Sequence, residues 1–485
     1  MKKFITFLIV FISIFRVHAQ PPDFIWANNI EYSSPSSGLD NSFVTDPSGN
    51  IYRIGHFIDT VDFDPGPGTY NLISKGQEDI FVIKLNSSGA LVWAKSMGGS
   101  NYDIGTSIAV DENGFIYLSG YFYDSCDFDP GPGISNLVSA GFHDAFISKL
   151  DPSGNFLWCK KIGGSGYDDI RSIVLDSAGS IYLTGVYRNT VDFDPGVGVY
   201  LLTGVMYNDF FICKLDNSGA FLWARGFGGP KDEVAYCIAV NTLGETYCVG
   251  AFKGTVDFDP GVGTYSLTSA SAGTEDDLFY CKLDASGNFL WAKQIGGGDI
   301  QYGYSLAIDQ GGNLLSTGIF RYTVDFNPGA GVDTLSSPTF SQNMYVLKLD
   351  PSGNFVWVKG VSSNGIVNGY DIMLDENDNI YTTGLFCDTT DFDPGPGVYT
   401  LDGGEYSTAF LWKLNPSGNL IWALPVGTGG CSFGQGIVLY GNSIYMTGCF
   451  NLAVDFDPGA DIYELYSHQS SYRDIFFLKL QISPN

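Results

Sequence analysis

The sequence predicts an all-β fold assembled from repeats, and three observations lead to this prediction. First, a five-residue motif, Asp-Phe-Asp/Asn-Pro-Gly, occurs in copies that begin at residues 62, 127, 192, 257, 325, 391 and 455. Second, these seven copies lie about 65 residues apart, so repeats of that length fill residues 20–485 and leave no room for a second domain. Third, 62 glycines, 21 prolines and 15% aromatic residues are typical of short strands joined by tight turns.

The first predicted element is a signal peptide over residues 1–19. Lys2 and Lys3 precede an apolar run from Phe4 to Phe15, and small residues follow before a cleavage point at Gln20. As a helix the run would reach about 18 Å, whereas a bilayer core is about 30 Å thick, so it is too short to span. We therefore expect an exported protein, secreted or held at the cell surface, that does not cross the membrane.

Each repeat is predicted to hold four short strands, which we call A to D. In the third repeat, residues 172–176, a Ser-Ala-Gly turn and residues 181–185 form one hairpin. The five-residue motif, called the tag below, follows. A second hairpin then joins residues 209–215 to residues 221–225 through an Asn-Ser-Gly turn. Because these strands carry apolar residues on both faces, each sheet should be sandwiched between neighbours, as in a β-propeller whose blades surround an axis.

The order of the strands predicts how such a ring closes. Strand D contains a Trp, and within the repeats this residue is Trp93, Trp158, Trp223, Trp291, Trp357 and Trp422. A further copy, Trp26, precedes the first strand A, while the chain ends with a strand C at residues 475–480. We therefore predict a seven-bladed β-propeller over residues 20–485. Its N-terminal strand pairs into the last blade, so that no blade is left with an open edge.

The repeats resemble a known family. Their Gly-Asn-Ile-Tyr stretch, their Asp-x-Phe-x-x-Lys-Leu-Asp strand and their Ser-Gly-Asn-x-x-Trp turn are similar to motifs of the secreted bacterial β-propeller repeat proteins of the SBBP type. The resemblance covers essentially the whole chain after residue 19. It implies a propeller but no particular activity, because propellers serve as enzymes, lectins and scaffolds.

Acidic residues recur at two places in most repeats and are candidate calcium ligands; the fifth repeat has Asn327 and Asn343 there, and the sixth has Thr408 before strand C. The tag offers two carboxylates followed by glycine, like the start of a calcium loop, and a further Asp precedes strand C. The hypothetical calcium sites comprise Asp62, Asp64, Asp79, Asp127, Asp129, Asp144, Asp192, Asp194, Asp209, Asp257, Asp259, Asp277, Asp455, Asp457 and Asp474. The other interpretation is turn chemistry, in which Asp accepts backbone N–H bonds and Pro-Gly fixes the bend. The sequence leaves both open.

Other repeated residues are predicted to be structural. A Lys in every strand C, Lys84 in the first repeat, should pair with the Asp that ends strand A, and the Trp of strand D should pack between blades. A Gly that ends each strand B, such as Gly185, should mark a backbone constraint. Small residues should pack tightly around the axis, with a symmetric pocket for a small ligand as the alternative. These residues are Ser42, Ser107, Ser172, Cys237, Ser305 and Gly436, and Asp371 is the exception among them. The nine cysteines are expected to be mostly buried thiols.

Charge and composition narrow the range of functions that the protein can have. A net charge of -28 argues against binding to nucleic acid. His56, His143 and His468 lie in different repeats, so we expect neither a His-rich metal centre nor a Ser-His-Asp triad. We expect a monomeric, non-enzymatic extracellular module that binds a protein or glycan partner or acts as a scaffold, with calcium as a candidate stabilising ion. No catalytic or cofactor-binding residue is predicted.

The alternative is a glycan-active hydrolase of propeller fold, sialidase-like or with another pair of carboxylates. Sialidases carry an Asp-box turn between strands C and D, but here the spacing of Asp151, Gly154 and Trp158 departs from that motif. A catalytic carboxylate pair should also be singular, whereas the acids of this chain are repeated.

Overall fold

The computed structural model describes residues 20–31, 42–270, 275–297, 299–338, 341–361, 363–468 and 473–483. All regular elements named in these ranges are β-strands, which confirms the all-β prediction. Within the same ranges there is no helix long and apolar enough to cross a membrane. The predicted signal peptide, residues 1–19, lies outside the described residues.

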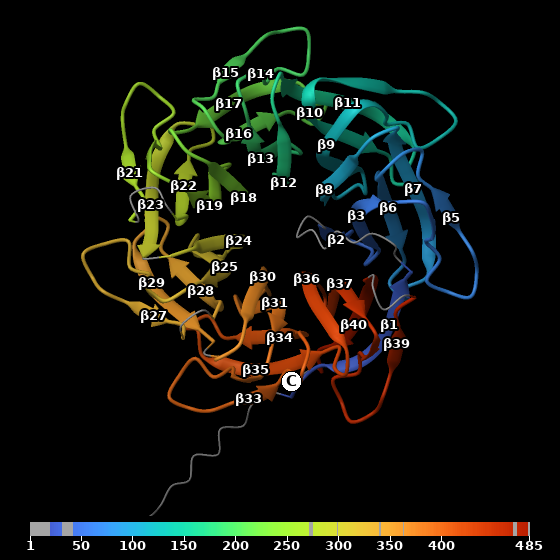
Figure 1. Ribbon diagram of the computed structural model, residues 1–485, viewed down its shortest axis with the longest axis vertical. Helices are drawn as coiled ribbons and strands as arrows, with labels where there is room; N and C mark the ends of the chain where they lie inside the picture. Colours follow the sequence, from blue (N-terminus) through green and yellow to red (C-terminus); the bar gives the residue numbers. More distant parts are fainter. Residues whose placement is uncertain are drawn as a thin grey trace, which may run out of the picture.

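The strands form antiparallel four-stranded units in the order A, B, C, D, arranged around a common centre (Figure 1). The first units are β2 (Phe43–Thr45), β3 (Ile51–Phe57), β6 (Asp79–Leu85) and β7 (Leu91–Gly99); β8 (Asp103–Val110), β9 (Ile116–Asp127), β10 (Asn136–Leu150) and β11 (Phe156–Gly164); and β12 (Asp169–Leu175), β13 (Ile181–Tyr187), β16 (Asp209–Leu215) and β17 (Phe221–Phe227). There follow β18 (Glu233–Val240), β19 (Thr246–Phe252), β22 (Asp277–Leu283) and β23 (Phe289–Gly297); β24 (Gln301–Ile308), β25 (Leu314–Phe320), β28 (Asn343–Leu349) and β29 (Phe355–Gly360); and β30 (Val367–Leu374), β31 (Ile380–Phe386), β34 (Thr408–Leu414) and β35 (Leu420–Val426).

The last unit brings the two ends of the chain together. Its strands are β36 (Cys431–Tyr440), β37 (Ser443–Asn451), β40 (Asp474–Gln481) and β1 (Asp23–Ile30). β1 runs antiparallel to β40, with Trp26 opposite Lys479, as the position of Trp26 predicted. This unit also contacts the first one, because the Lys479 ammonium donates to the Ser87 carbonyl at 3.2 Å and the Tyr440 hydroxyl donates to the Pro47 carbonyl at 2.8 Å.

The tags lie at the outer rim of the units, in hairpins between strands B and C (Figure 1). These hairpins are β4 (Thr60–Asp62) with β5 (Asn71–Ile73), β14 (Thr190–Asp192) with β15 (Leu201–Thr203), β20 (Thr255–Asp257) with β21 (Ser266–Thr268), β26 (Thr323–Asp325) with β27 (Thr334–Ser336), β32 (Thr389–Asp391) with β33 (Thr400–Asp402), and β38 (Ala453–Asp455) with β39 (Glu464–Tyr466). In the second unit, β9 and β10 themselves extend through the hairpin. The tag strand can also pair with strand D of the preceding unit, as Gly98 with Asp127 and Gly163 with Asp192 show.

The hydrophobic core lies between neighbouring units. One buried cluster, for example, combines Ile54 and Val82 of the first unit with Leu118 and Phe146 of the second. All residues of β3 are buried, which agrees with the prediction that strands with two apolar faces form sandwiched sheets. The Trp of strand D takes part in these interfaces as predicted, since a Cβ placed on Gly154 would lie only 3.2 Å from the Trp93 ring of the preceding unit.

The glycine that ends strand B is a backbone constraint, as predicted. A Cβ on Gly185 would lie 2.0 Å from the carbonyl oxygen of Asp169 in strand A, so no larger residue fits there without a shift of the backbone. The nine cysteines are all unpaired thiols, five of them buried, which agrees with the expectation of mostly buried thiols.

Candidate functional site

The tag forms a closed loop through its first aspartate. Asp62 Oδ1 accepts the backbone N–H groups of Asp64 at 3.0 Å and Tyr70 at 2.7 Å, and Asp64 Oδ1 accepts that of Gly66 at 2.8 Å. A Cβ on Gly68 would lie 2.1 Å from Asp64 Oδ2, which explains the second glycine of the loop. The two bonds to the first aspartate recur at Asp127, Asp192, Asp257, Asp325, Asp391 and Asp455. The tag carboxylates therefore make the hydrogen bonds that turn chemistry requires.

The aspartate before strand C faces the next unit. Asp79 is fully buried, its Oδ2 accepts the Lys75 N–H at 3.1 Å, and its carboxyl packs against Gly98, the residue that pairs with Asp127 of the following tag. Asp144 packs in the same way against Gly163. In the part of the chain that the structure describes, no three or more His, Cys, Asp or Glu side chains gather where they could hold a metal ion. Calcium binding at these positions stays a prediction.

Sequence reasoning missed a second buried acid, which lies across the interface from the first. Asp103 begins strand A of the second unit, and its Oδ2 accepts the Gly99 N–H at 2.6 Å. Burial, together with the nearby charge of Asp79, raises the pKa of Asp103 to about 7. Asp168 and Glu233 take the same place opposite Asp144 and Asp209. The signal was present in the sequence, since an acid follows four residues after a Gly-Gly pair in all three repeats.

One of these acid pairs joins the third and fourth units. Asp209 and Glu233 are both almost completely buried, and the backbone N–H groups of Val205 and Gly229 donate to one carboxyl oxygen of each. Burial, and then the charge of Asp209, raise the pKa of Glu233 to about 9. The other oxygen of each carboxyl has no hydrogen-bond partner in the protein. A proton held by the pair accounts for two acids in this position, because two like charges buried close together repel each other strongly.

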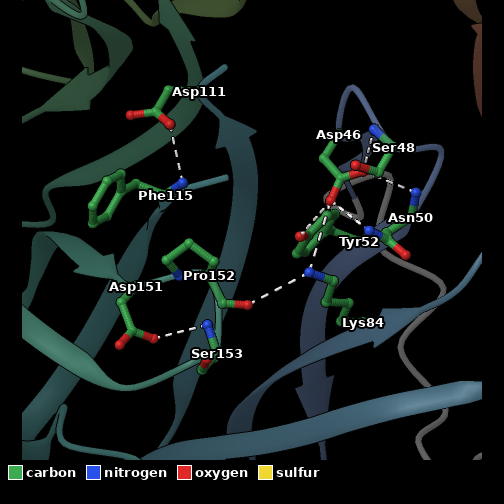
Figure 2. Close-up of polar contacts among 10 residues, drawn as sticks. All are labelled: Asp46, Ser48, Asn50, Tyr52, Lys84, Asp111, Phe115, Asp151, Pro152 and Ser153. Carbon is green, nitrogen blue, oxygen red and sulfur yellow. Dashed lines mark hydrogen bonds and ion pairs between the residues drawn. The ribbon is translucent and has the colours of Figure 1, made fainter. Parts of the chain in front are cut away.

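The recurring lysine joins the turns of neighbouring units (Figure 2). Lys84 lies 3.7 Å from Asp46 Oδ2 and also donates to the Pro152 carbonyl of the next unit at 3.5 Å. The predicted ion pair is likewise present at Lys214 with Asp176, Lys348 with Asp309, and Lys413 with Asp375.

Three units depart from that pattern. In the last, where Tyr440 takes the place of the aspartate, Lys479 donates to the Ser87 carbonyl of the first unit. In the second, Lys149 lies over the Tyr117 ring at 4.5 Å, and no ion pair with Asp111 is found among the described residues. In the fourth, where Asn241 replaces the aspartate that ends strand A, Lys282 pairs with Glu245 at 2.8 Å, a partner that the sequence did not predict. The lysine of the second and fourth units still donates to a turn carbonyl of the next unit, Lys149 to Asn217 and Lys282 to Pro351, and so keeps a structural role.

The inner strands surround a cavity of about 720 Å³, so the expectation of tight packing around the axis was wrong. The small strand A residues, among them Ser107, Ser172 and Ser305, line it because their side chains are too short to meet across the axis. They bond instead to the neighbouring strand A. Ser107 Oγ, for example, accepts the Ile173 N–H at 3.2 Å. Cavities of this size are typical of small-ligand sites.

Asp371, the exception to the small-residue pattern, also bridges neighbouring strands. Its Oδ1 accepts the Ser305 hydroxyl at 2.8 Å and its Oδ2 accepts the Ile437 N–H at 2.9 Å. Burial raises the pKa of Asp371 to about 6. Among the described residues that line the cavity, Asp371 is the one carboxylate. Both of its oxygens are therefore used in holding three inner strands together.

Aromatic residues cover one side of the cavity. Tyr236, Tyr304 and Tyr370, which we call the tyrosine arc, each precede the small residue of strand A in three successive units. The ring centroids of Tyr236 and Tyr304 are 5.8 Å apart, as are those of Tyr304 and Tyr370. Arg171 continues the row, with its guanidinium 5.4 Å from the Tyr236 ring centre. Alignment of the repeats would have revealed this arc, because tyrosine occupies the same place in three of them.

Comparisons with a protein-family model and with known sequences indicate the class of protein to which the chain is similar. A model of the β-propeller repeat family, SBBP, matches residues 92–121, which run from strand D of the first unit through strand B of the second. An uncharacterized WD repeat-containing protein of Acanthamoeba polyphaga mimivirus, L264, is 25% identical over 88% of this chain. These two findings support a β-propeller repeat protein.

Two more proteins resemble parts or all of the chain. The regulatory protein FlaEY of Caulobacter vibrioides is 25% identical over 41% of this chain. The match covers 36% of the viral relative and 20% of FlaEY, so the chain spans only a fraction of either protein. The crystal structure of Sqt1 from Chaetomium thermophilum is 10% identical in sequence to this chain. The match covers 96% of this chain and 100% of the Sqt1 chain, with a TM-score of 0.39.

Proposed function

We propose that residues 20–485 fold as a closed seven-bladed β-propeller that acts outside the cell as a monomeric, non-enzymatic binding or scaffold module. The seven tags and the pairing of β1 with β40 support a closed ring. The contacts of Lys479 with Ser87 and of Tyr440 with Pro47 support it further, because they join the last unit to the first. Export is proposed from the signal peptide predicted over residues 1–19.

The observation that carries a binding function is the axial cavity. Most residues that recur in the repeats make structural contacts, as the tag loops and the strand C lysines do. The residues of the tyrosine arc and Arg171, by contrast, line a cavity and break the symmetry of the ring. A large cavity with aromatic walls and a few polar groups is the usual form of a ligand site. A purely structural scaffold has no need of one.

The hydrolase alternative finds less support. Glycoside hydrolysis by a carboxylate pair needs two acids that flank one bond, with separations of about 5–9.5 Å. Asp371 is the one carboxylate among the described residues of the cavity wall, and both of its oxygens bond to neighbouring strands. The acids that do form pairs, such as Asp209 with Glu233, are buried between units, where a glycan cannot reach them.

The proposed function predicts binding without turnover. Purified residues 20–485 should release no product from a panel of chromogenic glycosides. When immobilised, the protein should bind an extracellular glycan or protein through the cavity, and Tyr304→Ala should weaken this binding while the melting temperature stays within a few degrees of wild type. Turnover of any glycoside would contradict the non-enzymatic proposal, and binding that survives Tyr304→Ala and Tyr236→Ala would contradict the use of the cavity.

One experiment decides between the two interpretations of the tags, turn chemistry and calcium binding. Since the first tag aspartate already accepts two backbone N–H bonds, we expect the protein to melt at the same temperature in excess chelator and in millimolar calcium. A rise that depends on calcium concentration, and that disappears when Asp62, Asp127 and Asp192 are changed to Asn, would instead establish the tags as metal sites. Magnesium at equal concentration is the control for ionic strength.

A further inference from the structure

We propose that the axial cavity binds a neutral saccharide, which stacks on the tyrosine arc. This inference rests on the proposed binding function and names the chemistry of its ligand. The first support is geometric. Tyr236, Tyr304 and Tyr370 come from β18, β24 and β30, and neighbouring ring centroids in this row are 5.8 Å apart. A row of rings at this spacing offers consecutive apolar platforms along one wall of the cavity.

The arc is held in place yet open to the cavity. All three rings are only partly buried, although the residue before each of them, Ala235, Gly303 or Gly369, is buried. The Tyr370 hydroxyl accepts a hydrogen bond from Asn368 Nδ2 at 3.0 Å. The Tyr302 ring lies tilted beside that of Tyr304, with centroids 6.1 Å apart, and its hydroxyl donates to Asp276. Fixed rings lose little conformational freedom when a ligand binds, so the platform is organised in advance.

Polar groups complete the surface that a sugar requires. Tyrosine presents an apolar face together with a hydroxyl, which suits a ligand that has both C–H faces and hydroxyl edges. The Ser172 and Ser305 side chains, Arg171 and Gln435 also line the cavity.

The charges favour a neutral ligand. Arg171 is the one cation among the described residues of the cavity wall, and its Nε lies 3.3 Å from Asp169 Oδ1, so its charge is already paired. The protein as a whole carries a net charge of -28, which repels anions. Asp371 uses both oxygens on the strands around it and offers no free carboxylate to a cationic ligand. Neither an acidic nor a basic sugar finds a partner of opposite charge.

Isothermal titration and glycan arrays can test this inference on residues 20–485. The probes are neutral cello-, xylo-, manno-, malto-, galacto- and chito-oligosaccharides, with oligogalacturonate and sialyllactose as anionic counterparts. We expect at least one neutral series to bind. Tyr304→Ala and Tyr236→Ala should each weaken that binding about tenfold, the loss of one stacking contact. Tyr304→Phe, which keeps the ring, should retain most of it.

Tyr207→Ala is the matched control, because Tyr207 is exposed in the loop that follows β15 and lies away from the cavity. It should bind as wild type does, and melting curves of all variants show whether the fold is kept. Binding of the anionic probes alone, or of no saccharide, would overturn the inference. If a protein partner then binds in a manner that depends on Tyr304, the proposed binding function stands, while the inference that the ligand is a saccharide is wrong. If nothing binds through the arc, both are wrong.

Discussion

Glu233→Gln is expected to raise the melting temperature at pH 8 by at least about 2 °C and to leave it unchanged at pH 4. Folded Glu233 is fully buried against Asp209, and burial together with that neighbour raises its pKa from an ordinary 4.5 to about 9. The stability that the protonated group contributes is therefore complete below about pH 4.5 and is lost as the pH rises towards 9. Glutamine stays neutral throughout and can donate a hydrogen bond to Asp209.

Thermal melts of wild type and variant between pH 4 and pH 9 measure this difference. The next unit provides a natural precedent, since Gln301 there occupies the place of Glu233 and is likewise fully buried. Glu112→Gln, in an exposed turn, is the control and should change nothing. A lower melting temperature for Glu233→Gln at pH 8 would mean that the pair is held by a bound cation, which needs both charges, and not by a proton.

Deletion of residues 20–31 is expected to destabilise the protein on the order of 5–10 kcal/mol, enough to unfold it or to make it aggregate. The deletion removes β1, in which Ala27 and Ile30 are buried and Phe24 and Trp26 are partly buried. It also exposes the edge of β40, whose unpaired backbone groups invite association with another chain.

Chemical denaturation followed by fluorescence measures the loss of folding stability, and light scattering detects association of the shortened chains. A synthetic peptide of residues 20–31, added in excess, should restore much of the stability, whereas the same peptide with Trp26 and Ile30 changed to Asp should not. If the shortened chain unfolds at the same denaturant concentration as the full one, β1 is not needed for the ring.

The fold was largely predictable because its signals repeat. A turn such as Ser-Ala-Gly before Ile181 and the placement of Trp26 were enough to predict strand order and the pairing of β1 with β40. The ion pair of Lys84 with Asp46 was predictable for the same reason, since both residues recur at constant spacing. A repeated pattern allows each expectation to be checked against several copies within one sequence.

The site was less predictable because it depends on how far apart the inner strands lie around the common centre and on contacts between different repeats. Small residues such as Ser172 suggested close packing, but the inner strands leave their side chains too far apart to meet, and a cavity results. The partnership of Asp209 with Glu233 joins different repeats, so a reading of one repeat at a time could not find it. Asp371 was recognised only as an exception to the small-residue pattern, and it proved to connect neighbouring strands.

The pairing of β1 with β40 also affects the order in which parts of the molecule can fold. β1 is synthesised long before β40, and the two are neighbours only in the finished sheet. The intermediate units can assemble one after another as the chain emerges, but β1 has to wait for its partner with an unsatisfied edge. A chain that stopped before residue 474 would leave β1 without that partner. Formation of β40 is therefore a condition for the stability of β1 and of the unit that contains both strands.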